Sequence, residues 1–325
     1  MQREAIEHAI QLLRAGELVA FPTETVYGLG ADASNPGAVK KIYAAKGRPR
    51  NHPLIVHVAT VAQIEAWADA VPMLARRLAE RYWPGPLTLI LKRAAQVNDL
   101  VTGGQDTIAL RVPSHPIAQA LLRGFGGGIA APSANRYGRV SATRAEHVRA
   151  EFGDAVRCVL DGGASDVGIE STIVDTSGPR PVLLRPGYIT AQELEHTLGE
   201  PLAHVSASSP RAPGMLAKHY APQTPLMVME ADLMLELATS MTRQGQRVAI
   251  LARSARQPLL SGVTWIAAPV DHAGYAHDLY ANLRALDEAG CSAILVEQLP
   301  LDAAWAAIQD RLMRAAAGSA IPDAT

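Results

Sequence analysis

The chain has 325 residues, of which 48% are hydrophobic and 19% charged, and a length of this order allows about two domains. Its formal net charge of −1 argues against polyanion binding through bulk charge, so any recognition of phosphate must be local. No apolar run approaches the ~20 residues of a membrane-spanning helix, and the two cysteines, Cys158 and Cys291, predict reduced core thiols in a cytoplasmic protein rather than a disulfide framework.

The first 202 residues are expected to form one domain in which short strands and helices are mixed. Residues 1–14 predict an amphipathic helix, and its acidic residues exclude a signal peptide. Many strands with interspersed helices favour an α/β sheet domain over a helical bundle. The expected strands are 18–21, 54–58, 87–91, 107–112, 128–131 and 171–175, and the further helices are 36–45, 61–68, 72–82, 116–122 and 145–152.

Residues 203–225 are rich in Ser, Pro and Ala and have no clear period, which predicts a long linker. Loops of this length are usually either disordered or functional lids. Residues 226–325 then alternate regularly between strand and helix patterns, which predicts a small parallel sheet with helices on its faces. The expected strands are 226–230, 247–251, 264–268 and 293–297, and the expected helices are 231–243, 275–288 and 303–316.

Several common catalytic motifs are absent. The chain has no P-loop, no G-x-S-x-G elbow and no H-E-x-x-H. Residues 28–33 fit G-x-G-x-x-[GA], but no acid follows about 20 residues later, as a dinucleotide site requires. His52 and His57 have no Cys or acidic residue nearby that could complete a zinc site. An ordinary role for the two histidines is therefore favoured over zinc binding, and no metal site is predicted.

Polar groups instead gather at the ends of the expected strands. The segment PTETVYGLG, residues 22–30, follows a strand directly and is either a ligand-binding loop or a glycine-rich turn with a capping threonine. Residues 46–54, KGRPRNHPL, bring three cations and a histidine to the entrance of the next strand. Such cations suit phosphate, since arginine grips oxygens bidentately and lysine acts as a point charge, whereas the alternative is a solvated basic loop.

Further polar residues follow the same rule. Arg111 lies inside an apolar strand and therefore needs an anion, either a structural salt-bridge partner or the carboxylate of a ligand. Small hydroxyl and amide groups follow another strand at residues 132–135 and 141. Residues 168–175 and 184–187 add a serine and an arginine. Sites of α/β proteins are usually assembled at strand ends, so these groups together predict a ligand site.

In order and spacing, residues 22–30, 46–53, 133–135, 168–175 and 185–187 resemble the YrdC-like family of threonylcarbamoyl-AMP synthases. Residues 209–215 and 218–222 resemble the linker of its longer, two-domain members, so the resemblance covers essentially the whole chain. It implies a twisted open-sheet YrdC-like catalytic domain over 1–202, a linker or lid over 203–225, and a small Rossmann-like parallel-sheet domain over 226–325.

The resemblance also implies a reaction: L-threonine, bicarbonate or CO₂, and ATP give threonylcarbamoyl-AMP and pyrophosphate, for the t6A modification of tRNA. Such a nucleotidyltransferase would receive Mg²⁺ with its ATP. The implied catalytic residues are Lys46, Arg48, Ser133 and Asn135. L-Threonine would be bound by Thr25, His57, Arg111, Ala131 and Ser171, and ATP by Arg48, His52, Thr107, Ser133, Ser141, Arg185 and Tyr220.

The implied chemistry needs positioning and cations around phosphates rather than a covalent nucleophile, which agrees with the absence of a catalytic dyad. A carbamate decomposes readily in water, so the linker is interpreted as a lid, with Tyr220 folding back onto the nucleotide. Transient contact with the downstream tRNA-modifying enzymes is expected, no membrane partner is expected, and direct tRNA binding stays open.

Two alternatives belong to other functional classes. A non-enzymatic binder of double-stranded RNA is disfavoured, because aromatic residues make up only 5% of the chain and the net charge is near zero. A carbamoyl-transfer enzyme of hydrogenase maturation would need additional zinc-finger and acylphosphatase-like segments, which the chain lacks.

Overall fold

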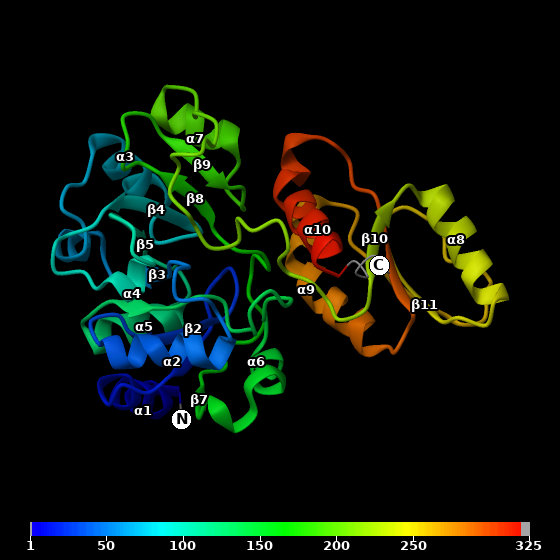
Figure 1. Ribbon diagram of the computed structural model, residues 1–325, viewed down its shortest axis with the longest axis horizontal. Coiled ribbons are helices and arrows are strands. Elements are labelled where there is room, and N and C mark those ends of the chain that lie inside the picture. The colour runs from blue at the N-terminus through cyan, green and yellow to red at the C-terminus, as the bar shows by residue number, and fades with distance from the viewer. Residues whose placement is uncertain (1, 320–325) are drawn as a thin grey trace. The chain divides into compact units, whose positions relative to one another are not determined.

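A computed structural model describes residues 2–319. It divides the chain into two compact units (Figure 1). The first comprises Met1–Tyr137 and Ala142–Met215, and the second Gly138–Ser141 and Leu216–Thr325. The change from one unit to the other at Met215 falls inside the stretch expected to be a linker, and the short segment Gly138–Ser141 joins the second unit.

The first unit is built on a mixed sheet, which has nine strands within the described residues, in the order β7-β1-β2-β6-β3-β5-β4-β8-β9. Pairs β3/β5, β4/β8 and β1/β7 are parallel, and the remaining neighbours are antiparallel. The strands are β1 (Val19–Phe21), β2 (Gly28–Asp32), β3 (Ile55–His57), β4 (Leu87–Lys92), β5 (Thr107–Arg111), β6 (Ile129–Ala130), β7 (Cys158–Val159), β8 (Thr172–Asp175) and β9 (Val182–Arg185).

Helix α2 (Pro36–Lys46) begins and ends where local chemistry predicts. Asn35 accepts hydrogen bonds from the N–H groups of Gly37 and Ala38 at the start of α2, and Gly47 ends that helix in the left-handed conformation. The helices are α1 (Gln2–Arg14), α2 (Pro36–Lys46), α3 (Met73–Tyr82), α4 (Asp99–Thr102), α5 (Pro116–Phe125), α6 (Ala145–Phe152) and α7 (Ala191–Leu198), with 3₁₀ turns η1 (Val61–Ala66) and η2 (Gly153–Ala155).

The glycine-rich stretch at residues 28–32 is a strand rather than the loop or turn expected from its composition. The reason is close packing at Gly30. A Cβ atom there would lie 2.8 Å from the Phe21 ring and 2.9 Å from the Ile129 side chain. A residue with a side chain would therefore force the Phe21 and Ile129 side chains to move, so glycine is the residue that fits this strand.

Side-chain alternation along the strands separates the two faces of this sheet. One face carries the main core, in which Leu29, Val56, Leu89 and Leu110 pack together with residues of α2 and α3. The other face is apolar at both ends. Phe21 and Ile129 pack there with α1 and α5, whereas a separate cluster forms around Ile55, Ile90, Ala109 and Ile173. We call this second face the site face.

The second unit is a parallel sheet, four-stranded within the part of the chain described, in the order β10-β13-β11-β12. Together with the large mixed sheet, it confirms the predicted fold class. Its elements are β10 (Leu226–Met229), α8 (Ala231–Arg243), β11 (Val248–Ala252), β12 (Val263–Ala267), α9 (His272–Glu288), β13 (Ala293–Glu297), η3 (Ala303–Trp305) and α10 (Ala306–Ser319). None of the helices within residues 2–319 has the length and apolar character needed to cross a membrane.

Candidate functional site

Strand pairing places His57 and Arg111 next to each other on the site face, because they are direct partners across β3 and β5. Both side chains are buried. Burial, followed by the nearby charge of Arg111, lowers the pKa of His57 to about 3, so its imidazole is neutral near pH 7. The Nδ1 atom of His57 is buried and has no hydrogen-bond partner among the described residues. A neutral ring nitrogen without a partner is suited to a ligand contact.

Arg111 makes three different contacts with its guanidinium. Nη1 donates to the Thr25 hydroxyl at 2.9 Å, and Nη2 donates to Glu24 Oε1 at 2.7 Å. Nε donates to the carbonyl of Gly85 at 3.3 Å. Of the two partners that the sequence left open for Arg111, the structure thus contains the salt bridge. Three of the five guanidinium N–H donors are used in this way, which is compatible with a ligand as an additional partner.

The loop between β1 and β2 is held in shape by Thr23. Its hydroxyl donates to the carbonyl of Val26 at 2.6 Å and accepts from the N–H groups of Thr25 and Val26. The Thr23 and Thr25 hydroxyl oxygens lie 2.9 Å apart. Threonine side chains commonly stabilise turns through such local bonds. The turn presents Thr25 and Glu24 to Arg111 as a preformed group.

A second group lies where β4 meets β8. The hydroxyl oxygens of Ser171 and Thr88 are 2.7 Å apart, and Arg185 Nη2 donates to both the hydroxyl and the carbonyl of Ser171. Arg185 Nη1 donates to the carbonyl of Pro213 at 2.9 Å. Ala212 and Met215 pack against the apolar cluster of the site face. The first part of the stretch expected to be a linker therefore covers this face within the first unit.

Three of the expected catalytic residues, Lys46, Ser133 and Asn135, form a third group. The Nζ of Lys46 donates to the carbonyl of Ser133 at 2.6 Å and to the carbonyl of Asn135. Burial, with a smaller effect from Arg48, lowers the pKa of Lys46 well below its ordinary value. Lys46 thereby fixes the turn after β6, which carries both Ser133 and Asn135.

Arg48 and His52 meet around the ring of Tyr137. The guanidinium carbon of Arg48 lies 5.7 Å from the centre of that ring, and Tyr137 Oη is 3.3 Å from His52 Nδ1. Arg48 Nη2 also donates to the carbonyl of Pro53 at 2.9 Å. Burial and then the charge of Arg48 lower the pKa of His52. This group combines a cation and an imidazole with aromatic support.

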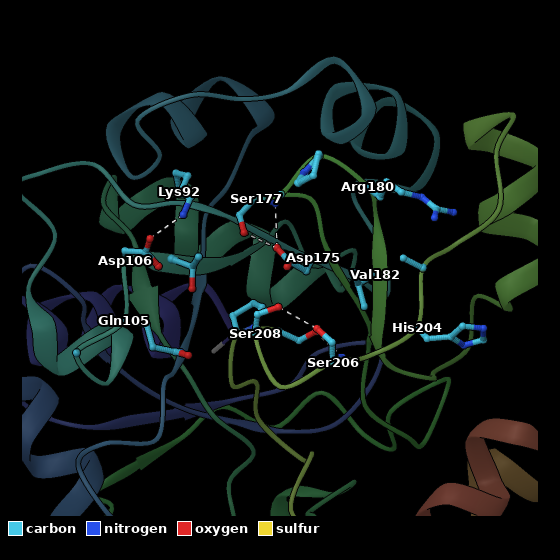
Figure 2. Close-up of a pocket in the computed structure, with 17 residues that line it drawn as sticks. Lys92, Gln105, Asp106, Asp175, Ser177, Arg180, Val182, His204, Ser206 and Ser208 are labelled. Carbon is cyan, nitrogen blue, oxygen red and sulfur yellow. Dashed lines mark hydrogen bonds and ion pairs between the residues drawn. The ribbon is translucent and has the colours of Figure 1, made fainter.

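A cavity in the first unit has a volume of about 680 Å³. Figure 2 shows residues that line it. Its wall contains Thr107, Lys92 and Asp175 from strands of the sheet, and His204 and Ser206 from the segment that follows α7. Lys92 pairs with Asp106 at 2.6 Å, and the Asp175 carboxylate accepts from the Ser177 hydroxyl at 2.7 Å. A cavity of this volume lies within the size range of small-molecule sites.

The remaining expected residues are placed as follows. Ala131 follows β6, and its N–H donates to the carbonyl of Ile55 at 2.9 Å. Ser141 and Tyr220 belong to the second unit. The carbonyl of Ser141 accepts from Arg284 Nε, and the ring of Tyr220 stacks on that of Tyr280, with centroids 5.6 Å apart. Among residues of the second unit, Tyr220 is thus buried in a packed aromatic pair.

Sequence reasoning assigned no role to three residues that the structure adds to these groups, namely Glu24, Thr88 and Tyr137. Glu24 stands between two threonines in the 22–30 motif, so its position next to Thr25 was a usable signal. Ile90 lies on the site face, and Thr88 precedes it by two residues in the same strand. Strand alternation would therefore have placed Thr88 on the site face as well. Tyr137 gave no such signal, because only the fold brings it to His52.

Comparison with known proteins gives two family matches. Residues 11–187 match the Sua5/YciO/YrdC family, described as telomere recombination, and residues 189–317 match the threonylcarbamoyl-AMP synthase C-terminal domain. The threonylcarbamoyl-AMP synthase of Bacillus subtilis is 42% identical over 97% of this chain and 94% of its own length. That of Pyrococcus abyssi is 40% identical over 96% of both chains. A solved structure of P. abyssi Sua5 complexed with L-threonine superposes with a TM-score of 0.90 and 39% identity, over 97% of this chain and 94% of that one.

Proposed function

This chain belongs to the Sua5/YrdC family of threonylcarbamoyl-AMP synthases, and on that premise we propose that it forms threonylcarbamoyl-AMP and pyrophosphate from L-threonine, bicarbonate or CO₂, and ATP. The product would supply the t6A modification of tRNA. The proposal makes the protein a cytoplasmic nucleotidyltransferase that passes an unstable product to the downstream tRNA-modifying enzymes.

The observation that carries the proposal is the group formed by Thr25, His57 and Arg111. A guanidinium and a hydroxyl lie 2.9 Å apart, next to a neutral buried imidazole, and these groups suit an amino acid with a carboxylate and a side-chain hydroxyl. Arg111 would take the threonine carboxylate. Ser171 and the backbone near Ala131 complete the proposed threonine site.

The ATP side of the proposal rests on the groups around Lys46 and Arg48. Both cations lie next to the turn that carries Ser133 and Asn135, and a phosphate chain needs such donors. His52, Thr107 and Arg185 are proposed as further contacts to the nucleotide. Ser141 and Tyr220 are proposed as contacts on the resemblance alone, and so is the role of residues 203–225 as a lid.

Mg²⁺ would enter with ATP. Among residues 2–319, no three His, Cys, Asp or Glu side chains are grouped so that they could hold a metal ion. The ion would therefore be held mainly by the phosphates and by water, which is how Mg²⁺ commonly binds with nucleotides. Bound in this way, it would neutralise phosphate charge, whereas the chain's own cations would orient the phosphate chain.

In the proposed reaction, the neutral amine of threonine attacks CO₂ and gives a carbamate after loss of a proton. A carbamate oxygen then attacks the α-phosphorus of ATP, the bond to the bridging oxygen breaks, and pyrophosphate leaves. Arg111 orients the amino acid, and Arg48 stabilises the charge that develops on the phosphates. The apolar cover by Ala212 and Met215 would help to exclude water from the carbamate.

Pyrophosphate release tests the proposal. The protein is incubated with MgATP and bicarbonate, and L-threonine is compared with L-serine and with no amino acid. We expect release that requires both threonine and bicarbonate. If the folded protein releases no pyrophosphate under any of these conditions, the enzymatic proposal is wrong, and binding to double-stranded RNA becomes the next function to measure.

A further inference from the structure

We propose that Glu24 is a positioning residue for the amino acid, which it serves by holding the guanidinium of Arg111 in the orientation that binds the carboxylate of L-threonine. This inference rests on the proposed function. It assigns a task to a residue that touches none of the three substrates in the proposal. It also explains why a buried carboxylate lies beside a site that is meant to attract another carboxylate.

Both oxygens of Glu24 are engaged within the protein. Oε1 accepts from Arg111 Nη2 at 2.7 Å, and Oε2 accepts from the N–H of Ser114 at 3.1 Å. The Glu24 and Arg111 side chains are only 6% and 5% exposed. A carboxylate held through both oxygens is poorly placed to take a proton from the threonine amine. Its geometry fits a fixed support rather than a general base.

The support is itself anchored on its backbone side. The carbonyl of Glu24 accepts from the N–H of Val167 at 2.7 Å, and the neighbouring Thr23 closes the turn through its hydroxyl. Glu24 thus ties the 22–27 loop to Ser114, which follows β5, and to Val167, which precedes β8. An arginine side chain has many rotamers, and a binding group has to be held within about 0.5 Å of its working geometry. Glu24 and Thr25 together provide that constraint from one turn.

The pair also limits the charge of the site. A buried guanidinium without this support would accept anions of any shape, including phosphate groups of ATP, but would hold none of them in a fixed geometry. The charge of Glu24 balances that of Arg111, so the pair as a whole has no net charge. A ligand must then match the remaining guanidinium N–H donors in geometry. This preference for a correctly shaped carboxylate is what we expect Glu24 to contribute.

The test is the variant Glu24→Gln. The glutamine carbonyl can still accept from Arg111, but its NH₂ group then faces the N–H of Ser114, so both original bonds cannot be kept. We expect the dissociation constant of L-threonine, measured by calorimetry, to rise at least about tenfold, whereas the KM of ATP stays within about twofold. Glu297→Gln is the matched control, since it changes a buried carboxylate in the second unit, and it should leave both constants unchanged.

A double-mutant cycle separates positioning from general stability. If Glu24 acts through Arg111, the variant with both Glu24→Gln and Arg111→Ala binds threonine no more weakly than Arg111→Ala alone. Additive losses would overturn the inference. If Glu24→Gln does not fold, as judged by circular dichroism, Glu24→Asp takes its place. That variant keeps the charge but is one methylene shorter, so we expect a smaller loss of threonine affinity and an unchanged KM for ATP.

Measurements on the wild-type protein separate a failure of the proposed function from a failure of the inference about Glu24. A wild-type chain that neither binds threonine nor releases pyrophosphate overturns the proposed function, and the inference about Glu24 with it. A wild-type chain that binds threonine, together with a folded Glu24→Gln variant of equal affinity, overturns only the positioning role.

Discussion

Each unit of the molecule contains at least one buried carboxylate, and Glu24 of the first unit and Glu297 of the second are satisfied in different ways. In the first unit, Glu24 pairs with the side chain of Arg111. In the second, Glu297 lies at the carboxyl end of β13 and accepts from the N–H groups of Arg253, Ser254 and Ala255 as well as from the Ser254 hydroxyl. Burial alone would raise the pKa of Glu297, but these donors outweigh it and lower the pKa.

This difference indicates which of the two units binds the substrates. Successive backbone N–H groups after a strand form a natural anion site, and in the second unit Glu297 already fills it. On the site face of the first unit, Glu24 instead shares the guanidinium of Arg111 with Thr25, and the buried Nδ1 of His57 has no partner among residues 2–319. We therefore assign the proposed threonine site and the cations for the phosphates to the first unit, and the following predictions test that assignment.

The largest expected effect is that of Arg111→Ala. The change removes the proposed partner of the threonine carboxylate and leaves Glu24 buried without its counter-charge. Threonine binding should weaken by roughly 2–5 kcal/mol, and the free energy of unfolding should fall by about 3–5 kcal/mol. Calorimetry and urea unfolding measure the two quantities. Arg149→Ala is the control, since its ion pair with Asp161 is more than half exposed and should contribute little.

Arg48→Ala should act on the other substrate. Loss of a charged hydrogen bond to phosphate corresponds to about 1.5–3 kcal/mol, which raises the KM of ATP about tenfold to a hundredfold. The dissociation constant of threonine, measured without ATP, should stay unchanged. A variant in which threonine affinity falls as much as ATP use would contradict the separation of the two groups on the first unit.

Glu297→Ala tests the second unit. It leaves three backbone N–H groups and one hydroxyl without their acceptor, and we expect the free energy of unfolding of this unit to fall by about 1–3 kcal/mol. Hydrogen exchange of the β11 and β13 amides would show the loss. Pyrophosphate release with threonine should continue at the wild-type rate at temperatures where the variant is folded. A marked loss of activity would place chemistry in the second unit as well.

Over a single pH unit, the smallest expected effect is the one that depends on His57. Its pKa is lowered from 6.5 to about 3 in the folded chain, so between these values the unfolded chain binds the additional proton. Stability contributed by neutral His57 is present above about pH 6.5 and is lost on acidification, by up to about 1.4 kcal/mol per pH unit. Urea unfolding at several pH values should show a shallower dependence for His57→Gln. Equal slopes would mean that His57 is not buried as a neutral ring.

Prediction from sequence succeeded where a signal is local. Proline and glycine punctuation located α2 and α5, and regular alternation of strand and helix patterns predicted the parallel sheet of the second unit. It failed for β2, where glycine composition suggested a loop. It also missed β7 and β9. These strands have two and four residues, which is too short to show a clear period.

The candidate site, too, was predicted from the sequence only in part. Motif order was enough to suggest the family, which the comparisons then confirmed, and to nominate Thr25, His57 and Arg111 as a set. Their proximity follows from strand register, because His57 pairs with Arg111 across β3 and β5, which are separated by about fifty residues of chain. The partnership of Arg111 with Glu24, and that of Lys46 with the turn after β6, likewise join distant segments.

The sequence by itself therefore determined the fold class, the family and the kinds of side chain that a site would contain, because these depend on local pattern and motif order. Only the tertiary structure decided which partner each buried polar group takes. A buried charge needs a counter-charge or hydrogen bonds, and the group that provides them can lie far away along the chain. For Arg111 that group is Glu24, and for Glu297 it is a backbone turn.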